Sequence, residues 1–227
     1  QTAAGMITAP PGYLKRVREL CTKYDVLLIA DEVATGFGRT GKMFACQHEG
    51  VTPDLMAISK GLTGGYMPLA ATLTTEEIYK GFLGTYEDFK TFFHGHSYTG
   101  NPLGCAVALA NLDVFQREKT LARLQPKIKT MARLLQPLWQ LPHVGDIRQR
   151  GFMAAIELVE DKKTRRPYPL KARIGHRVCR IARQHGLLLR PLGNIIVLIP
   201  PLSTTLKDLQ HMIETVRYAI VSAHDQL

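Results

Sequence analysis

The chain has 227 residues, of which 45% are hydrophobic and 21% are charged, and its formal net charge is +10. This length allows one large domain or two small ones with a buried core, and the composition excludes a disordered protein. No apolar run reaches the roughly 18–20 residues that a membrane helix needs. The first residues show no secretory signal and no initiating Met, so we expect the chain to begin partway through a longer protein.

The cysteines and the basic residues limit the kinds of ligand to be expected. The four cysteines are widely spaced and show no paired-ligand pattern, which argues against a zinc site or a disulfide framework and fits a reducing cytoplasm. Basic residues are scattered over expected helices, apart from a short run at 162–166. This scatter favours a solvated basic surface over a nucleic-acid-binding face, which is the less favoured alternative.

The first half of the chain has the pattern of an α/β protein. Helical spacing of apolar residues before position 25 precedes an apolar strand at 26–30, and further strands are expected at 55–59 and 69–73. This order suits half of a doubly wound, mostly parallel sheet. Pro102 opens a helix of small residues, as proline tolerates the first helical turn.

The second half has the pattern of a separate small α+β domain. A helix from about 119 to 139 leads into this part. Strands are expected at 152–159, 187–190 and 195–199, with helices at 172–185 and after the capping pair Thr205 and Asp208. We therefore divide the chain into a first domain of residues 1–117 and a second of residues 118–227.

Asp31 and Lys60 each stand at the end of an apolar strand. Runs of this kind are typical of parallel strands covered on both faces, and ligands bind beyond the carboxyl ends of such strands. Desolvating an ammonium group is costly and makes the amine more nucleophilic, so Lys60 could form a Schiff base with an aldehyde cofactor. Asp31 could then hold the ring nitrogen of that cofactor protonated. A salt bridge between the two side chains is the structural alternative.

Three other segments have more than one interpretation. The loop at 36–42 imitates a dinucleotide fingerprint and a P-loop, but the strand and the helix that both motifs need are not adjacent to it, so a tight loop over the sheet edge is favoured. His94 and His96 could be a metal pair, but no acidic or thiol partner is near in sequence, so a loop role is favoured. Arg190 is either a clamp for a carboxylate or a buried structural ion pair.

Four segments together resemble the class III aminotransferases, which use pyridoxal 5'-phosphate (PLP) on the fold-type I scaffold. The separation of Asp31 and Lys60 (60 − 31 = 29 positions) is similar to that in this family. The third and fourth segments most resemble the biotin-pathway branch, whose members aminate 8-amino-7-oxononanoate to 7,8-diaminononanoate. The segments are 28–41 (LIADEVATGFGRTG), 53–62 (PDLMAISKGL), 94–105 (HGHSYTGNPLGC) and 186–193 (GLLLRPLG), the last with Pro200 and Pro201.

The resemblance implies roles for residues on the cofactor side of the site. Lys60 would form the Schiff base with PLP and shuttle a proton between the substrate carbon and the cofactor. Asp31 would pair with the pyridinium nitrogen, and Val33 would pack under the ring. Family chains are longer at the N-terminus, where they carry the phosphate cup and the stacked aromatic ring, so this chain resembles the C-terminal part of the large domain followed by the small domain.

The resemblance also implies a homodimer with active sites at the subunit interface. Gly95, His96 and Ser97 would reach the cofactor phosphate and the substrate of the neighbouring subunit. Many relatives have Thr at the position of Ser97, and the hydroxyl is retained here. Arg190 would bind the substrate carboxylate. The amino donor is S-adenosylmethionine in most members of the branch and lysine in some, and the segment 94–98 is similar to forms that allow either.

Overall fold

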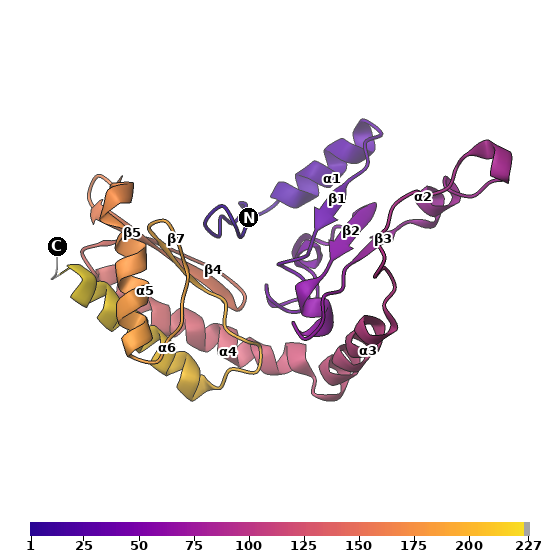
Figure 1. Cartoon of the computed structure of the whole chain (residues 1–227). Coiled ribbons are helices and arrows are strands. Elements are labelled where there is room, and N and C mark those ends of the chain that lie inside the picture. Colours follow the sequence, from indigo (N-terminus) through magenta and orange to yellow (C-terminus); the bar gives the residue numbers. More distant parts are fainter. Residues whose placement is uncertain (225–227) are drawn as a thin grey trace. The chain divides into compact units, whose positions relative to one another are not determined.

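The computed structural model describes residues 1–224 (Figure 1), in which contacts divide the chain into two compact units. The N-terminal unit comprises residues 9–37 and 42–120, and the C-terminal unit comprises residues 1–8, 38–41 and those from 121 onward. The expected domain boundary at 117/118 stays a prediction, because the contacts also assign two short early segments to the C-terminal unit. No helix formed by the described residues is long and apolar enough to cross a membrane.

The N-terminal unit contains a three-stranded sheet of order β1-β2-β3. Strands β1 (Ile29–Asp31) and β2 (Leu55–Ile58) are parallel, whereas β3 (Ala71–Thr74) is antiparallel to β2. The expected strands at 26–30, 55–59 and 69–73 therefore exist but are shorter or shifted. The helical elements of this unit are α1 (Tyr13–Lys23), η1 (Ala45–Glu49), η2 (Lys60–Thr63), α2 (Glu76–Lys80), η3 (Tyr86–Asp88) and α3 (Pro102–Arg117).

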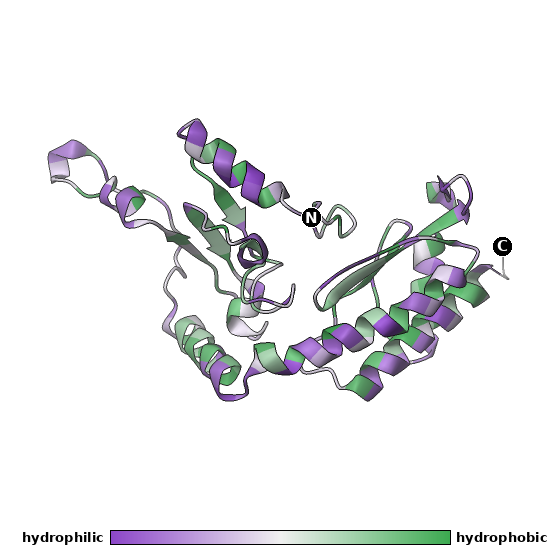
Figure 2. Ribbon diagram, turned by 180° about the vertical axis from the view of Figure 1, so that it is seen from behind, coloured by the Kyte–Doolittle hydropathy of each residue, from purple (hydrophilic) through white to green (hydrophobic). Residues whose placement is uncertain are grey.

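The first strand is covered on one face only, which corrects the expectation of burial on both faces. Leu28 is buried in a cluster to which α1 contributes Leu14 and Val17. The neighbouring residues Leu27 and Ile29 alternate to the other face and are 59% and 66% exposed. Figure 2 shows β1 and β2 as hydrophobic strands. The sequence pattern thus predicted the strand, but the described residues leave its second face open to solvent.

The C-terminal unit is an antiparallel sheet of order β4-β5-β8-β7 with helices on one face, and β6 pairs with β5. The expected strand at 187–190 is wrong, because the final hairpin pairs only Pro191 with Ile196 and Leu192 with Ile195. The strands are β4 (Val144–Arg150), β5 (Met153–Asp161), β6 (Arg166–Pro167), β7 (Pro191–Leu192) and β8 (Ile195–Leu198). The helical elements are α4 (Thr120–Leu135), η4 (Gln136–Gln140), η5 (Leu170–Ala172), α5 (Ile174–Gln184) and α6 (Leu206–His224).

The main core of the C-terminal unit lies between this sheet and the helices α4, α5 and α6 (Figure 1). Alternate residues of β5, such as Ile156 and Leu158, are fully buried against the helices. The last helix begins as expected, since the Asp208 N–H donates to Thr205 Oγ1 at 3.1 Å.

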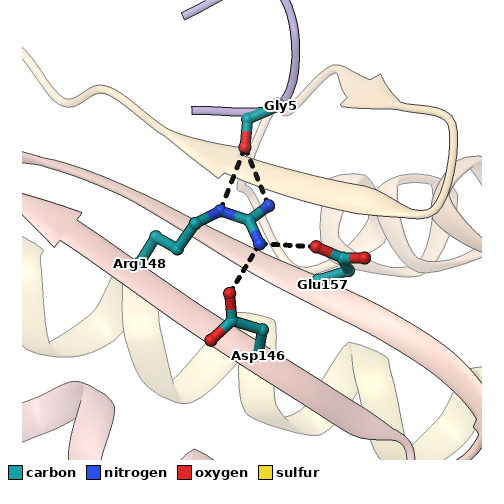
Figure 3. A network of polar contacts seen from close by, with 4 residues as sticks. All are labelled: Gly5, Asp146, Arg148 and Glu157. Carbon is teal, nitrogen blue, oxygen red and sulfur yellow. Dashed lines mark hydrogen bonds and ion pairs between the residues drawn. The ribbon is translucent and has the colours of Figure 1, made fainter. Parts of the chain in front are cut away.

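Residues 1–8 cover the opposite face of this sheet, where Met6 packs against Met153 and Ala155. Figure 3 shows how a single guanidinium holds the segment: Arg148 donates to the Gly5 carbonyl at 2.8 and 3.2 Å. The same guanidinium pairs with Asp146 at 2.6 Å and with Glu157 at 2.5 Å. Residues 1–8 are therefore held on the sheet by the packing of Met6 and by hydrogen bonds from the Arg148 guanidinium.

A second polar cluster, formed by His143, Tyr168 and His224, joins the end of α6 to the residues next to β4 and β6. The Tyr168 hydroxyl lies 2.9 Å from His143 Nδ1 and 2.8 Å from His224 Nδ1. The two imidazole rings stack with centroids 3.6 Å apart. Burial and then the neighbouring His143 lower the pKa of His224 from 6.5 to about 4. The cluster therefore holds His224 in its neutral form.

Candidate active site

Asp31 is the last residue of β1 and Lys60 lies just beyond the end of the neighbouring parallel strand β2, at the same end of the sheet. Asp31 lies opposite Ala57 in the register of β1 and β2. The ladder continues one step further, since the Glu32 N–H donates to the Ala57 carbonyl at 2.9 Å. Lys60 follows the end of β2 after one residue, the helix cap Ser59, and is the first residue of η2. The two groups thus lie at the carboxyl edge, where open α/β sheets bind their ligands.

The Asp31 carboxylate is oriented by its own loop. Its Oδ1 atom accepts the Val33 N–H at 3.0 Å, which fixes the side chain through a short Asx-type turn. Within residues 1–224, Oδ2 has no hydrogen-bond partner, and Asp31 and Lys60 form no ion pair. The salt-bridge alternative is therefore wrong for this chain, and one carboxylate oxygen is available to a protonated nitrogen of a ligand.

Lys60 has an unusual backbone conformation. Its φ angle is +44°, in the left-handed region, which costs a residue with a side chain about 1–2 kcal/mol. Such strain persists only where the surrounding structure imposes it, and it is frequent at functional sites. The turn is closed by the Gly65 N–H, which donates to the Lys60 carbonyl at 3.2 Å. The Lys60 side chain itself is exposed, so the expected desolvation of the amine is not found in the described residues.

The loops that carry Asp31 and Lys60 are packed against each other through Phe37 and Gly61. A Cβ atom on Gly61 would lie 2.6 Å from Phe37 Cβ, so only glycine fits. Phe37 is 3% exposed and meets Phe44 and Phe115 edge to face, with ring centroids 5.8 and 6.3 Å away. This contact fixes the spacing between the two candidate catalytic segments.

A buried carboxylate stabilises the loop after Asp31. Glu32 is 2% exposed, and its side chain accepts the Cys46 N–H at 2.8 Å and the Thr35 hydroxyl. Burial and then the charge of Glu32 raise the pKa of the Cys46 thiol from 9.0 to about 11. Glu32 therefore has a structural role beside the exposed Asp31, although the two acids are adjacent in sequence.

The glycine-rich loop does not form a phosphate-binding site. Residues 38–41 belong to the C-terminal unit, where a Cβ on Gly38 would meet Leu121 at 3.1 Å and one on Gly41 would meet Ile128 at 3.1 Å. Side chains of α4 thus pack closely against both glycines. Lys42 donates to the Gln47 carbonyl at 2.9 Å, and the segment that follows is the short 3₁₀ helix η1. The loop serves packing, which rules out the P-loop interpretation.

The segment with Gly95, His96 and Ser97 forms its hydrogen bonds within itself, and not with the loops that carry Asp31 and Lys60. Gly95, His96 and Ser97 are exposed, and the His96 N–H donates to Thr99 Oγ1 at 3.0 Å within its own loop. No hydrogen bond or ion pair between described residues joins these three to Asp31 or Lys60. Within residues 1–224, no group of three His, Cys, Asp or Glu side chains could hold a metal ion.

Arg190 belongs to the C-terminal unit and is exposed. It directly precedes β7 and forms no ion pair with any residue of the described chain. The alternative of a buried structural ion pair is therefore wrong, and the guanidinium is open to an anionic ligand.

Sequence reasoning did not identify Phe37 or Asn111 as residues that shape the site. Asn111 lies on α3 and donates to the carbonyls of Gly61 and Leu62 at 2.9 and 3.0 Å. The available signal was its position, since Gly104, Ala108, Asn111 and Phe115 share the face of α3 that packs inward. A polar residue on an apolar face points to a specific hydrogen-bonding role.

Comparison with known protein families identifies the class of protein to which this sheet edge belongs. The model of the class-III aminotransferases matches residues 1–220, and the chain belongs to that family. Its fold is that of the C-terminal part of a PLP-dependent, fold-type I transferase, as expected, because transaminase structures cover nearly the whole chain.

Three similar proteins within this family carry the same enzyme name. The adenosylmethionine-8-amino-7-oxononanoate aminotransferase of Nitratidesulfovibrio vulgaris is 58% identical over 98% of this chain and 41% of its own length. The enzyme of the same name from Geobacter sulfurreducens is 57% identical over 97% of this chain and 49% of its own length. The crystal structure of that enzyme from Methanocaldococcus jannaschii superimposes with a TM-score of 0.95 at 50% identity, covering 97% of this chain and 51% of that one. The chain thus spans about half the length of the curated relatives it matches.

Proposed function

We propose that the protein containing this chain is a PLP-dependent aminotransferase of biotin biosynthesis. It would transfer an amino group to 8-amino-7-oxononanoate to give 7,8-diaminononanoate, with S-adenosylmethionine as the donor. The observation that carries this proposal is the 57–58% identity over nearly the whole chain with two relatives whose names state that acceptor and that donor. Because the chain spans about half of those relatives, the activity is proposed for the intact protein.

The exposed amine and the free carboxylate oxygen fit PLP, which is an aldehyde with a protonated ring nitrogen. When bound, PLP supplies an aldehyde for amine exchange and an electron-withdrawing ring. Lys60 would hold the cofactor covalently through its amine and would move the proton at the substrate carbon. Asp31 Oδ2 would accept the ring N–H, while Oδ1 stays bound to Val33 N–H. Val33 is half-buried beside this carboxylate, as expected for a residue that packs under a ring.

Anion binding would fall to residues from other parts of the chain. The exposed loop with Gly95, His96 and Ser97 offers backbone N–H groups and a hydroxyl, and it would reach the phosphate and substrate in a partner subunit of a homodimer. Arg190 would bind the substrate carboxylate, in keeping with its exposed and unpaired guanidinium. All four cysteines carry free thiols, which supports the proposal that the protein acts in the cytoplasm.

The amino donor is the finer part of the proposal. Lysine is the alternative donor for the same reaction, and another keto acid or aldehyde, as in other class III ω-aminotransferases, is the alternative acceptor. The test supplies the PLP-loaded intact protein with 8-amino-7-oxononanoate and either S-adenosylmethionine or lysine, and measures 7,8-diaminononanoate by mass spectrometry. We expect product with S-adenosylmethionine, none with Lys60→Ala, and an undiminished yield with Lys80→Ala, which alters an exposed lysine of α2. Absence of product with both donors would contradict the proposed acceptor.

A further inference from the structure

The strained turn at Lys60 is held by a side chain from another element. Asn111 lies on α3, fifty positions away in sequence from Gly61, and its Nδ2 atom donates to the Gly61 carbonyl at 2.9 Å and to the Leu62 carbonyl at 3.0 Å. These carbonyls belong to the two residues that directly follow Lys60 in η2. One amide group therefore fixes both peptide units beyond the proposed catalytic amine.

The position of Asn111 is set by packing and not by a flexible contact. Its neighbours on the same helical face, Ala108 and Phe115, pack in the cluster that contains Phe37 and Leu62. The other end of the Asn111 amide also has a neighbour, since a Cβ placed on Gly64 would lie 3.2 Å from Asn111 Oδ1. Figure 2 shows that α3 is largely hydrophobic, which makes this amide the exception on its inward face.

The geometry of the turn shows why such a support is needed. Lys60 has a φ angle of +44°, a conformation that residues with a side chain rarely adopt unless their surroundings impose it. Within the turn, the Leu62 N–H donates to Ser59, the Gly64 N–H to Gly61 at 3.2 Å and the Gly65 N–H to Lys60. Asn111 is therefore a second donor to the Gly61 carbonyl, and among the described residues it is the one donor to the Leu62 carbonyl. Without the amide, the Leu62 carbonyl would need water or another turn geometry, and the Gly61 carbonyl would keep only the Gly64 N–H.

From these contacts we infer that Asn111 is a positioning residue, which holds Lys60 in its left-handed turn and so fixes the direction in which the amine leaves the sheet edge. The inference rests on the proposed role of Lys60 in PLP attachment. Asn111 itself touches no reacting group. Its effect would therefore be on how fast Lys60 engages an aldehyde, and not on whether the amine can react.

The test measures covalent labelling of Lys60 in the cofactor-free intact protein. PLP is added for timed intervals, borohydride fixes the adduct, and mass spectrometry gives the labelling rate at each lysine. We expect Asn111→Asp, which keeps the shape but removes both donors, to slow labelling of Lys60 about tenfold or more while the exposed Lys80 is labelled at an unchanged rate. Hydrogen exchange of the Gly65 amide in the same protein should become faster.

A matched control separates positioning from a general loss of stability. Asn194→Asp removes a similar amide bond, from Asn194 Nδ2 to the Tyr168 carbonyl at 2.8 Å in the C-terminal unit, and should leave the labelling of Lys60 within twofold of the wild-type rate. If Asn111→Asp does not fold, Asn111→Ala removes both bonds without adding a charge. Equal labelling of Lys60 in wild type and in the folded Asn111 variant would overturn the inference alone. A wild-type protein whose Lys60 reacts no faster than Lys80 would overturn the proposed function together with it.

Discussion

The packing of Gly61 against Phe37 can be tested by adding a single carbon atom at position 61. In Gly61→Ala, the new Cβ would lie 2.6 Å from Phe37 Cβ and 3.0 Å from two carbons of its ring, closer than side-chain carbons approach. Phe37 cannot move aside easily, because it is 3% exposed and packed between two further aromatic rings. Overpacking of this kind costs about 1–3 kcal/mol, so we expect a loss of that size in the N-terminal unit.

The control is Gly104→Ala, in α3 of the same unit. There the nearest atom to the new Cβ is Leu69 Cδ1 at 3.5 Å, an ordinary contact, and the glycine lies inside a helix. Alanine is favoured over glycine in helices by about 1 kcal/mol, so this variant should be as stable as wild type or more so. Urea unfolding measures the difference, and hydrogen exchange of peptides covering residues 55–75 locates it. If Gly61→Ala unfolds at the same urea concentration as Gly104→Ala, the proposed contact between the two loops is wrong.

Two further predictions concern the C-terminal unit. Arg148→Ala should expose residues 1–8 to proteolysis, because the Gly5 carbonyl loses its donor. It should also lower the free energy of unfolding by about 1–2 kcal/mol, because two partly buried carboxylates lose their partner. Arg150→Ala, which alters an exposed arginine of β4, should change neither measurement. His224 has a pKa of about 4 when folded and 6.5 as its ordinary value. The unfolded chain therefore binds more protons between these values, and stability should fall by about 1–2 kcal/mol from pH 6.5 to 4 after allowance for solvent access. A thermal-unfolding series against pH should lose this slope in His224→Gln and keep it in His211→Gln.

The sequence predicted the elements whose patterns are local. The helix at Pro102 begins with its proline at the first turn, and the last helix begins with the predicted Thr205 and Asp208 pair. The positions of Asp31 and Lys60 after neighbouring strands also followed from apolar runs that end in a charged residue. These inferences succeeded because each depends on a short stretch of chain whose physical preference is strong.

Other features depend on contacts that no local pattern contains. The conformation of Lys60 comes from Asn111 and Gly61, and the need for glycine at 61 comes from the side chain of Phe37 on another loop. The glycines at 38 and 41 imitated a phosphate loop because close packing against a helix and close approach to a phosphate need the same small residue. The exposed face of β1 could not be predicted either, since an apolar run does not say what covers it.

The central claim is that Lys60 is the amine that binds the cofactor. The direct measurement is borohydride reduction of the intact protein after incubation with PLP, followed by digestion and mass spectrometry of the modified peptide. The proposed function predicts a single dominant adduct on Lys60, lost in Lys60→Ala and retained in Lys42→Ala. A folded intact protein that takes up no PLP, or whose adduct lies on Lys42 or another lysine, would contradict it.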